Sequence, residues 1–314
     1  MERKDEKHMT VVEIGRVRFA VSCDLPIAND DLPASYRNFL IPDSGADCAP
    51  TVDVRVIPDL PPLPSNAQPL TIGEAWSMFS DGTDRRLVWH SPKSNDPVWH
   101  ATLDANAERV TVYCGPRLLR SEGGRTVVRN PLRYPLDQIL MMYFLARRGG
   151  VIVHSAGLSA GGRGLLCAGR SRAGKSTLAR LWREHARGEL LSDDRIVVRA
   201  ARDSNVRPSS FTLFGTPWPG TLGVASAEAA RAVAVLFLQH GDENRLVALS
   251  STQALERLLP VVSIPWFDPE LLPAALGVCE QVAMGLPAYD FFFTPDKRAV
   301  EPLHKLLARG PSTR

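Results

Sequence analysis

The chain has 314 residues, which is enough for two domains of ordinary size or for one large domain. Hydrophobic residues make up 44% and charged residues 23%, a composition typical of a soluble globular protein. The formal net charge of +3 is small for this length, so the sequence gives no indication of binding to nucleic acid or to an anionic membrane.

Cysteine usage and the apolar runs indicate the compartment. No two of the five cysteines are spaced as a C-x-x-C pair, which predicts free thiols in a reducing environment. They are Cys23, Cys48, Cys114, Cys167 and Cys279. The longest apolar run, at residues 139–146, is too short to span a bilayer, and the charged first ten residues lack the apolar segment of a secretory signal. We therefore expect a cytoplasmic protein that is not attached to a membrane.

The first part of the chain, residues 1–130, is expected to form a β-rich N-terminal domain. Apolar and polar residues alternate over residues 11–21 and 51–57, which is typical of half-buried strands. The stretches RRLVWH, PVWHATLD and ERVTVYC are separated by turn-forming residues and predict further strands.

The second part, residues 131–314, has the pattern of a mixed α/β domain. A helix is predicted at 135–148, strands at 151–160 and 164–168, and a helix at 176–186 that is followed by a strand. This order of strand, loop, helix and strand is the one that a phosphate-binding loop requires. Further helices are predicted at 251–260, at 272–284 and near the C-terminus. The predicted fold class is therefore α/β, with a P-loop core behind a β-rich domain.

The stretch GRSRAGKST matches the spacing G-x-x-x-x-G-K-[ST] of a phosphate-binding loop. In such a loop, backbone N–H groups and the positive end of the following helix surround an anion. The lysine reaches the β- and γ-phosphates, and the serine offers its hydroxyl to Mg²⁺. We expect nine residues to hold the phosphates of ATP: Gly169, Arg170, Ser171, Arg172, Ala173, Gly174, Lys175, Ser176 and Thr177.

Arg172 stands where many related loops have glycine. Its side chain either faces solvent or leans over the γ-phosphate as an arginine finger supplied within the chain. Loops of this type occur in transporter ATPases, GTPases, motor proteins and small-molecule kinases, so the loop alone does not define the reaction.

Two adjacent carboxylates follow the loop in LLSDDRIVV. Side chains alternate along a strand, so Asp193 and Asp194 are expected to point in different directions and to have different roles. One carboxylate is expected to serve Mg²⁺, and the other to accept a proton from an attacking hydroxyl. His154, on the strand before the loop, either contacts the γ-phosphate or orients an aspartate. The other histidines, among them His240, are expected to be structural.

The order of VHSAG, GRSRAGKSTLARL, LLSDD and FGTPWPG resembles the catalytic domain of HPr kinase/phosphorylase and its relatives. This HPr-kinase-like family is related to the nucleotide-dependent phosphoenolpyruvate carboxykinases, and the resemblance covers roughly residues 134–303. It implies a P-loop kinase core of the HPr-kinase/carboxykinase type, with ATP and Mg²⁺ as cofactors. Nothing in the β-rich N-terminal part resembles the N-terminal domain of the bacterial enzymes.

The resemblance also implies roles for individual residues. Asp193 is the expected proton acceptor, His154 supports the reacting phosphate, and Lys175 completes the predicted catalytic set. Ser176 and Asp194 are the predicted metal ligands. In FGTPWPG, Trp218 offers a flat apolar surface that belongs either to the core or to the acceptor site. The predicted acceptor-site residues are Thr216 and Trp218.

These observations predict an ATP- and Mg²⁺-dependent kinase. It would transfer the γ-phosphoryl group to a hydroxyl, above all a seryl group of a peptide, a protein or a small molecule. One alternative is a carboxykinase-like enzyme that acts on a small dicarboxylate, and another is a nucleotide-binding regulatory module without catalysis. The expected partners are the nucleotide and the hydroxyl acceptor, and assembly into a homo-oligomer is left open.

Overall fold

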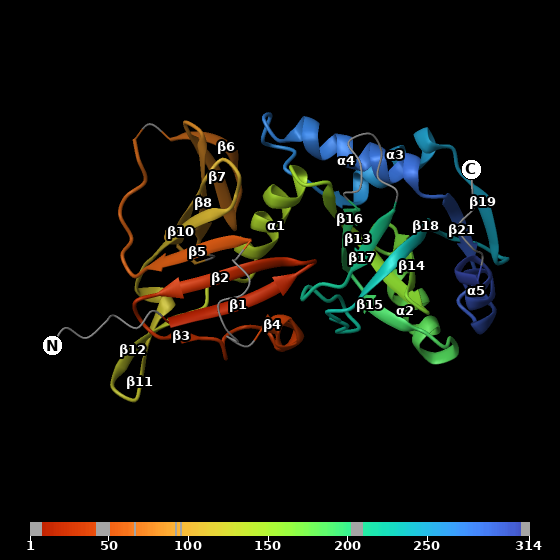
Figure 1. The fold of residues 1–314 in the computed structure, drawn as a ribbon, viewed down its shortest axis with the longest axis horizontal. Coiled ribbons are helices and arrows are strands. Elements are labelled where there is room, and N and C mark those ends of the chain that lie inside the picture. The colour runs from red at the N-terminus through yellow and green to blue at the C-terminus, as the bar shows by residue number, and fades with distance from the viewer. Residues whose placement is uncertain are drawn as a thin grey trace. The chain divides into compact units, whose positions relative to one another are not determined.

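The computed structural model describes residues 8–41, 51–65, 67–91, 93–94, 96–201 and 210–308. The chain divides into two compact units (Figure 1). Unit 1 comprises Met1–Phe144 and Trp266–Pro269, and unit 2 comprises Leu145–Pro265 and Glu270–Arg314. The division therefore follows Phe144 and not residue 130, because most of the helix α1 (Leu136–Ala146) is grouped with unit 1. No helix within the described ranges is long and apolar enough to cross a membrane.

Unit 1 is built from two sheets. A nine-stranded sheet has the order β4-β1-β2-β5-β10-β9-β8-β7-β6, and a three-stranded sheet has the order β11-β12-β3. The strands are β1 (His8–Ile14), β2 (Val17–Cys23), β3 (Ile27–Ala28), β4 (Leu40–Ile41), β5 (Val52–Ile57), β6 (Gln68–Ile72), β7 (Trp76–Asp81), β8 (Asp84–His90), β9 (Pro97–Leu103), β10 (Arg109–Cys114), β11 (Leu119–Glu122) and β12 (Arg125–Arg129). Two 3₁₀ helices, η1 (Ala34–Phe39) and η2 (Pro116–Leu118), lie between them. This part of the chain is β-rich, as its alternating sequence pattern predicts.

The hairpin of β1 and β2 illustrates how the sequence forms these strands. Gly15 and Arg16 both have positive φ (58° and 61°), and Ile14 lies opposite Val17. A two-residue turn with positive φ at both positions matches the twist of the strands that it joins. Alternate residues of β1 then face the core, where Val12 and Ile14 are fully buried.

The segment Trp266–Pro269 is held in unit 1 by a buried ion pair. Nε of Arg85 lies 2.7 Å from Oδ2 of Asp268, and the hydroxyl of Tyr143 donates to the same oxygen at 2.9 Å. The Asp268 side chain is fully buried, and that of Arg85 is 5% exposed. Burial, with the neighbouring Asp268 carboxylate, raises the pKa of Tyr143 well above its ordinary value, so the phenol remains a neutral donor.

Unit 2 contains the remaining strands and most of the helices. The strands are β13 (Gly150–Ala160), β14 (Arg163–Ala168), β15 (Glu189–Ser192), β16 (Arg195–Ala200), β17 (Phe211–Phe214), β18 (Ala229–His240), β19 (Arg245–Ala248), β20 (Val262–Ser263) and β21 (Ala288–Phe293). The helices are α2 (Lys175–His185), α3 (Ser251–Leu258), η3 (Leu259–Val261), α4 (Leu272–Gly285), η4 (Lys297–Ala299) and α5 (Val300–Ala308). The helices predicted at 176–186, 251–260 and 272–284 are confirmed as α2, α3 and α4.

Five strands of unit 2 close into a ring. β13 pairs with β14 and β16, β17 lies between β16 and β18, and β18 pairs with β14 to complete the ring. Within it, β14 and β18 run parallel, and the other neighbours run antiparallel. β21 and β19 extend the sheet outward from β18.

The predicted fold class, an α/β P-loop kinase core of the HPr-kinase/carboxykinase type, is therefore wrong. Strands account for 43% of the structure and helices for 24%, and a closed ring of strands with large sheets replaces the expected core. The reason lies in the connection between β13 and β14. Gly161 and Gly162 both have positive φ (56° and 72°), and Ala160 lies opposite Arg163. So short a turn joins antiparallel neighbours, whereas parallel strands need a crossover of a dozen or more residues.

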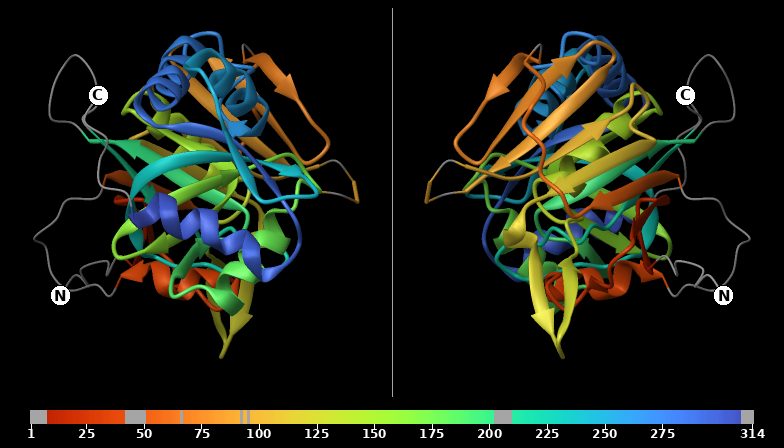
Figure 2. Two further views of the ribbon diagram at one scale, coloured as in Figure 1. Left: turned by 90° about the vertical axis from the view of Figure 1, so that its right-hand side faces the viewer. Right: turned by 90° about the vertical axis from the view of Figure 1, so that its left-hand side faces the viewer.

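The helices of unit 2 cover its strands on two sides (Figures 1 and 2). On one side, α3 and α4 contribute Leu258 and Val278 to a hydrophobic cluster with the strands. On the other side, α2 and α5 contribute Leu178, Trp182 and Leu303 to a second cluster. This packing fixes α2 directly after the end of β14, which is the arrangement that a phosphate-binding loop needs.

The cysteines agree with the prediction of free thiols. Cys23, Cys114, Cys167 and Cys279 are unpaired and buried, and Cys48 lies outside the described residues. Burial raises the pKa of both Cys114 and Cys279 to about 12, so these thiols remain protonated and unreactive at neutral pH.

Candidate active site

The predicted phosphate-binding loop joins β14 to α2 with a tight turn. Gly174 has a φ of 99°, and a Cβ at this position would lie 2.8 Å from Cζ of Phe293. A Cβ on Gly169 would lie 2.7 Å from Cβ of Ala173. Only glycine therefore fits at Gly174, and the loop turns directly into the first turn of α2, which begins at Lys175.

Lys175 closes this loop on itself. Its ammonium donates to the carbonyl oxygen of Gly169 at 2.8 Å and to that of Arg170 at 3.1 Å. The residue is 7% exposed, and burial lowers the pKa of its ammonium, an effect that the nearby Asp194 carboxylate partly offsets. The lysine charge is thus held at the loop, beside the positive end of the α2 dipole.

Arg172 adopts a backbone conformation that glycine would adopt without strain. Its φ is 70°, in the left-handed region, and its side chain is exposed. Nε2 of His240, at the end of β18, lies 3.1 Å from the Arg172 carbonyl oxygen. His240 therefore contacts the loop at its strained residue, whereas the sequence pattern placed it among the structural histidines.

The two aspartates after β15 have different surroundings. Oδ1 of Asp193 accepts the backbone N–H groups of Gly220 at 2.9 Å and Val224 at 3.2 Å, and Oδ2 accepts that of Leu222 at 2.7 Å. Asp193 is 1% exposed. Its carboxylate thus holds the backbone of residues 220–224, which begin at the last glycine of FGTPWPG.

Asp194 faces the opposite way, toward His154. Nε2 of His154 lies 2.8 Å from Oδ1 of Asp194, and Nε of Arg195 lies 3.8 Å from Oδ2. Burial alone would raise the pKa of Asp194, but the hydrogen bond from His154 and the charges of His154, Arg195 and Lys175 outweigh it and lower the pKa. The side chain is 28% exposed, so an ionised carboxylate remains open to a ligand.

These groups surround one cavity of about 340 Å³ in unit 2. Its lining includes nine of the predicted site residues: His154, Ser171, Arg172, Gly174, Lys175, Ser176, Thr177, Asp193 and Asp194. Gly220, Thr221 and His240 complete it. The hydroxyl of Thr221 donates to Oγ of Ser176 at 3.3 Å, which links residues 220–224 to the start of α2. No sequence motif identifies Thr221 or His240 as a site residue. The one sequence signal near Thr221 is the preceding Gly220, which is typical of a turn.

The predicted acceptor-site residues do not line this cavity. Thr216 is fully buried, and its hydroxyl donates to the carbonyl oxygen of Arg195 at 2.7 Å. Trp218 is 6% exposed. The stretch FGTPWPG thus brings its last residue, Gly220, to the cavity, while these two side chains lie in the interior.

The cavity suits a metal ion that arrives with a nucleotide. The described residues contain no group of three or more His, Cys, Asp and Glu side chains that could hold a metal ion by themselves. Mg²⁺ does not require such a group, because it usually keeps several waters and binds one or two protein oxygens together with substrate phosphates. The Ser176 hydroxyl and the Asp194 carboxylate, the two predicted metal ligands, carry oxygen atoms of this kind, and both residues line the cavity.

Neither the known protein families nor the curated proteins with which the chain was compared gave a match. The resemblance to HPr kinase/phosphorylase therefore rests on the short motifs alone.

Proposed function

We propose that the protein is an ATP- and Mg²⁺-dependent phosphotransferase that acts on a hydroxyl, with a seryl group as the preferred acceptor. One observation carries this proposal. A loop with the spacing of phosphate-binding loops and an ionised aspartate paired to a histidine line the same cavity of about 340 Å³. Transfer of a phosphoryl group from a triphosphate to an alcohol needs a site for the phosphates and a carboxylate near the alcohol. An anion site that faces a carboxylate provides both.

The loop would bind the phosphates. Backbone N–H groups between Gly169 and Gly174 and the N-terminus of α2 favour an anion at this position. Lys175 adds a positive charge that is desolvated by burial and is therefore weakly screened. If the ammonium exchanged the carbonyl oxygens of Gly169 and Arg170 for phosphate oxygens, it would gain hydrogen bonds in which both donor and acceptor are charged.

Asp194 and His154 would handle the proton of the acceptor. The acceptor oxygen forms a bond to the γ-phosphorus as the bond from that phosphorus to the β,γ-bridging oxygen breaks, and ADP leaves. The hydroxyl proton passes to Asp194, whose orientation is fixed by His154 at 2.8 Å. A carboxylate with a lowered pKa is a weak base, so its main contribution is to orient the hydroxyl and to take the proton late in the reaction.

This proposal moves the role of proton acceptor from Asp193 to Asp194, which the sequence-based expectation gave to Mg²⁺, and it leaves Ser176 as the side chain that would hold the metal. Asp193 already accepts three backbone N–H groups and is almost inaccessible, so we assign it to positioning residues 220–224. Thr221 in that segment contacts Ser176, the residue that would offer its hydroxyl to Mg²⁺. When bound, Mg²⁺ would neutralise charge on the β- and γ-phosphates.

Isothermal titration calorimetry with ATP and MgCl₂ tests the binding half of this proposal. Lys175→Ala removes the buried charge at the loop and should weaken ATP binding by at least about tenfold. Lys305→Ala, on α5 and outside the cavity lining, is the matched control and should bind ATP as the wild type does. Equal ATP affinity in Lys175→Ala and wild type would contradict the assignment of the loop.

A further inference from the structure

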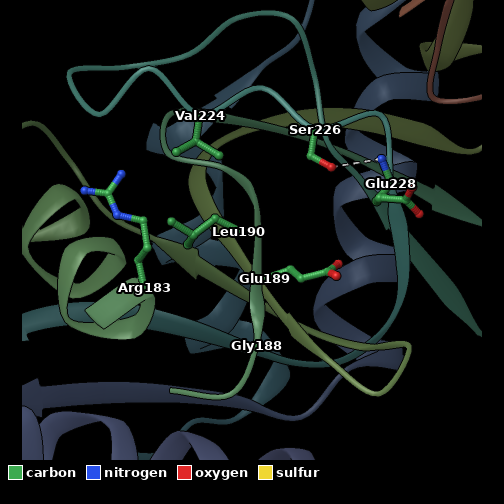
Figure 3. Close-up of a pocket in the computed structure, with 7 residues that line it drawn as sticks. All are labelled: Arg183, Gly188, Glu189, Leu190, Val224, Ser226 and Glu228. Atoms are coloured by element: carbon green, nitrogen blue, oxygen red, sulfur yellow. Dashed lines mark hydrogen bonds between the residues drawn. The ribbon is translucent and has the colours of Figure 1, made fainter. Parts of the chain in front are cut away.

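A second and larger cavity lies in unit 2. It has a volume of about 650 Å³, and Figure 3 shows the side chains around it. It is lined by Arg183, Gly188, Glu189, Leu190, Val224, Ser226 and Glu228. We call it the charged cavity, because three ionisable side chains stand around an apolar centre.

Charge is distributed unevenly around the charged cavity. Figure 3 shows the guanidinium of Arg183 on one side of Leu190 and Val224, and the carboxylates of Glu189 and Glu228 on the other. Within the described part of the chain, none of these three charged side chains has an ion-pair partner, and all three residues are exposed. The two carboxylates therefore favour binding of a cation on the side of Glu189 and Glu228. Arg183 disfavours binding of a cation on its own side of the cavity.

The charged cavity shares its walls with the cavity of about 340 Å³ at the loop, which we call the nucleotide cavity because it is the proposed ATP site. α2 contributes Ser176 to the nucleotide cavity and Arg183, seven residues later, to the charged cavity. The chain after β15 contributes Asp194 to the first, and β15 itself contributes Glu189 to the second. The third shared wall is residues 220–228, with Thr221 at one cavity and Val224 at the other.

These shared walls set the separation of the two cavities. Seven residues of α-helix rise about 10 Å, and the three residue steps from Leu190 to Asp193 span about 10 Å of extended chain. An extended polypeptide covers the same distance with about three residues. A chain whose seryl group reaches the γ-phosphate would therefore place a side chain in the charged cavity about three or four residues away.

We propose that the charged cavity binds a lysine or arginine side chain of an extended polypeptide acceptor, about three or four residues from the phosphorylated serine. Leu190 and Val224 would contact the aliphatic part of that side chain, and Glu189 and Glu228 would bind its charge. This inference rests on the proposed phosphotransferase function and adds a specificity site to it. Residues 220–228 would then contact both nucleotide and acceptor.

A serine-centred peptide array tests this inference. Each peptide has one serine and a systematically varied residue at every position within about five of it, and two signals are recorded: binding of fluorescently labelled protein and incorporation of label from γ-labelled ATP. Wild type should prefer lysine or arginine at a position about three or four residues from the serine, on one side only. The double variant Glu189→Gln, Glu228→Gln should bind the preferred peptides about three- to tenfold more weakly.

Two controls keep the outcome interpretable. Glu184→Gln removes an exposed carboxylate on α2 that does not line the charged cavity, so the basic preference of this variant should match that of wild type. The melting temperature of the double variant should equal that of wild type, because these are exposed side chains.

The inference is overturned if the array shows no basic preference, or if the double variant keeps it. It is also overturned if free arginine occupies the cavity as tightly as the preferred peptides, because the ligand would then be a small cation. Binding and transfer are read separately, so a basic preference in binding without incorporation of label would contradict the phosphotransferase and not the cavity.

Discussion

Nε2 of His154 lies 2.8 Å from Oδ1 of Asp194, whereas the adjacent Asp193 points away and accepts three backbone N–H groups. Adjacent residues at a strand end thus serve different purposes, which follows from the alternation of side chains along a strand. One carboxylate is accessible and paired with an imidazole, and the other organises the neighbouring segment. The proposed division of roles between positioning and proton transfer depends on this geometry.

Asp193→Asn should loosen residues 220–224. An asparagine places an N–H donor where the carboxylate accepts the backbone N–H groups of Gly220, Leu222 and Val224, so at least one buried donor loses its acceptor. We expect the free energy of unfolding to fall by about 1.5–3 kcal/mol and the three amides to exchange hydrogen faster. Hydrogen–deuterium exchange with mass spectrometry measures this effect. Asp194→Asn is the matched control, and equal exchange in the two variants would contradict the positioning role of Asp193.

Gly174→Ala should destabilise the protein more than Gly223→Ala. Both glycines have positive φ, 99° and 70°, so alanine strains the backbone at either site by about 1–2 kcal/mol. A Cβ at Gly174 also lies 2.8 Å from Cζ of Phe293, whereas nothing lies within 4 Å of one at Gly223. Urea denaturation should show an additional loss of about 1–3 kcal/mol for Gly174→Ala. Equal losses in the two variants would mean that Phe293 does not restrict the loop.

Asp268→Asn should strongly destabilise unit 1. The substitution removes the carboxylate that lies 2.7 Å from the buried guanidinium of Arg85, and breaking a buried ion pair typically costs about 3–5 kcal/mol. Asp104→Asn is the matched control, because its partner Arg109 is exposed and the pair should contribute less than about 1 kcal/mol. Thermal or urea denaturation of both variants measures the difference. A loss of less than about 1 kcal/mol in Asp268→Asn would contradict the anchoring of Trp266–Pro269 by this ion pair.

The contribution of Asp194 to stability should depend on pH. Its pKa is lowered in the folded protein, so the ionised form stabilises the fold above the pKa of the unfolded chain, about 3.9. This stabilisation is lost as the pH falls through the lower, folded pKa. The free energy of unfolding of wild type should therefore exceed that of Asp194→Asn near neutral pH, and the difference should shrink below about pH 4. A difference that stays constant from pH 7 to pH 3 would contradict the lowered pKa.

The turn of the predicted phosphate-binding loop and the start of α2 could be predicted, because each depends on residues close together in sequence. His154 pairs with Asp194, which lies forty residues further along the chain, and orienting an aspartate is one of the two roles that the sequence predicts for this histidine. The spacing of Gly169, Gly174 and Lys175 defines its own turn and helix start. Strand pairing is not local, and the closure of β14 onto β18 joins segments more than sixty residues apart. The fold class could not be derived from helix and strand order for this reason.

The site residues that the sequence did not reveal have a similar explanation. His240 reaches the cavity because it ends β18, a strand remote in sequence from the loop, and Thr221 lies there within the segment whose backbone Asp193 holds. The role of Asp193 depends on backbone N–H groups, which every non-proline residue carries and which leave no signature in the sequence. Trp218 was ambiguous because an aromatic side chain after a turn suits both a core and a binding surface.

The most direct test of the proposed function is single-turnover transfer from γ-labelled ATP to serine-containing peptides, with saturating Mg²⁺. The account predicts label on the seryl oxygen with wild type, and a rate about 10²–10⁴-fold lower with Asp194→Asn at similar ATP affinity. Asp193→Asn should retain more of the rate than Asp194→Asn. Label at wild-type rate in Asp194→Asn would contradict its role as proton acceptor, and the absence of labelled peptide with wild type that binds ATP would contradict the phosphotransferase itself.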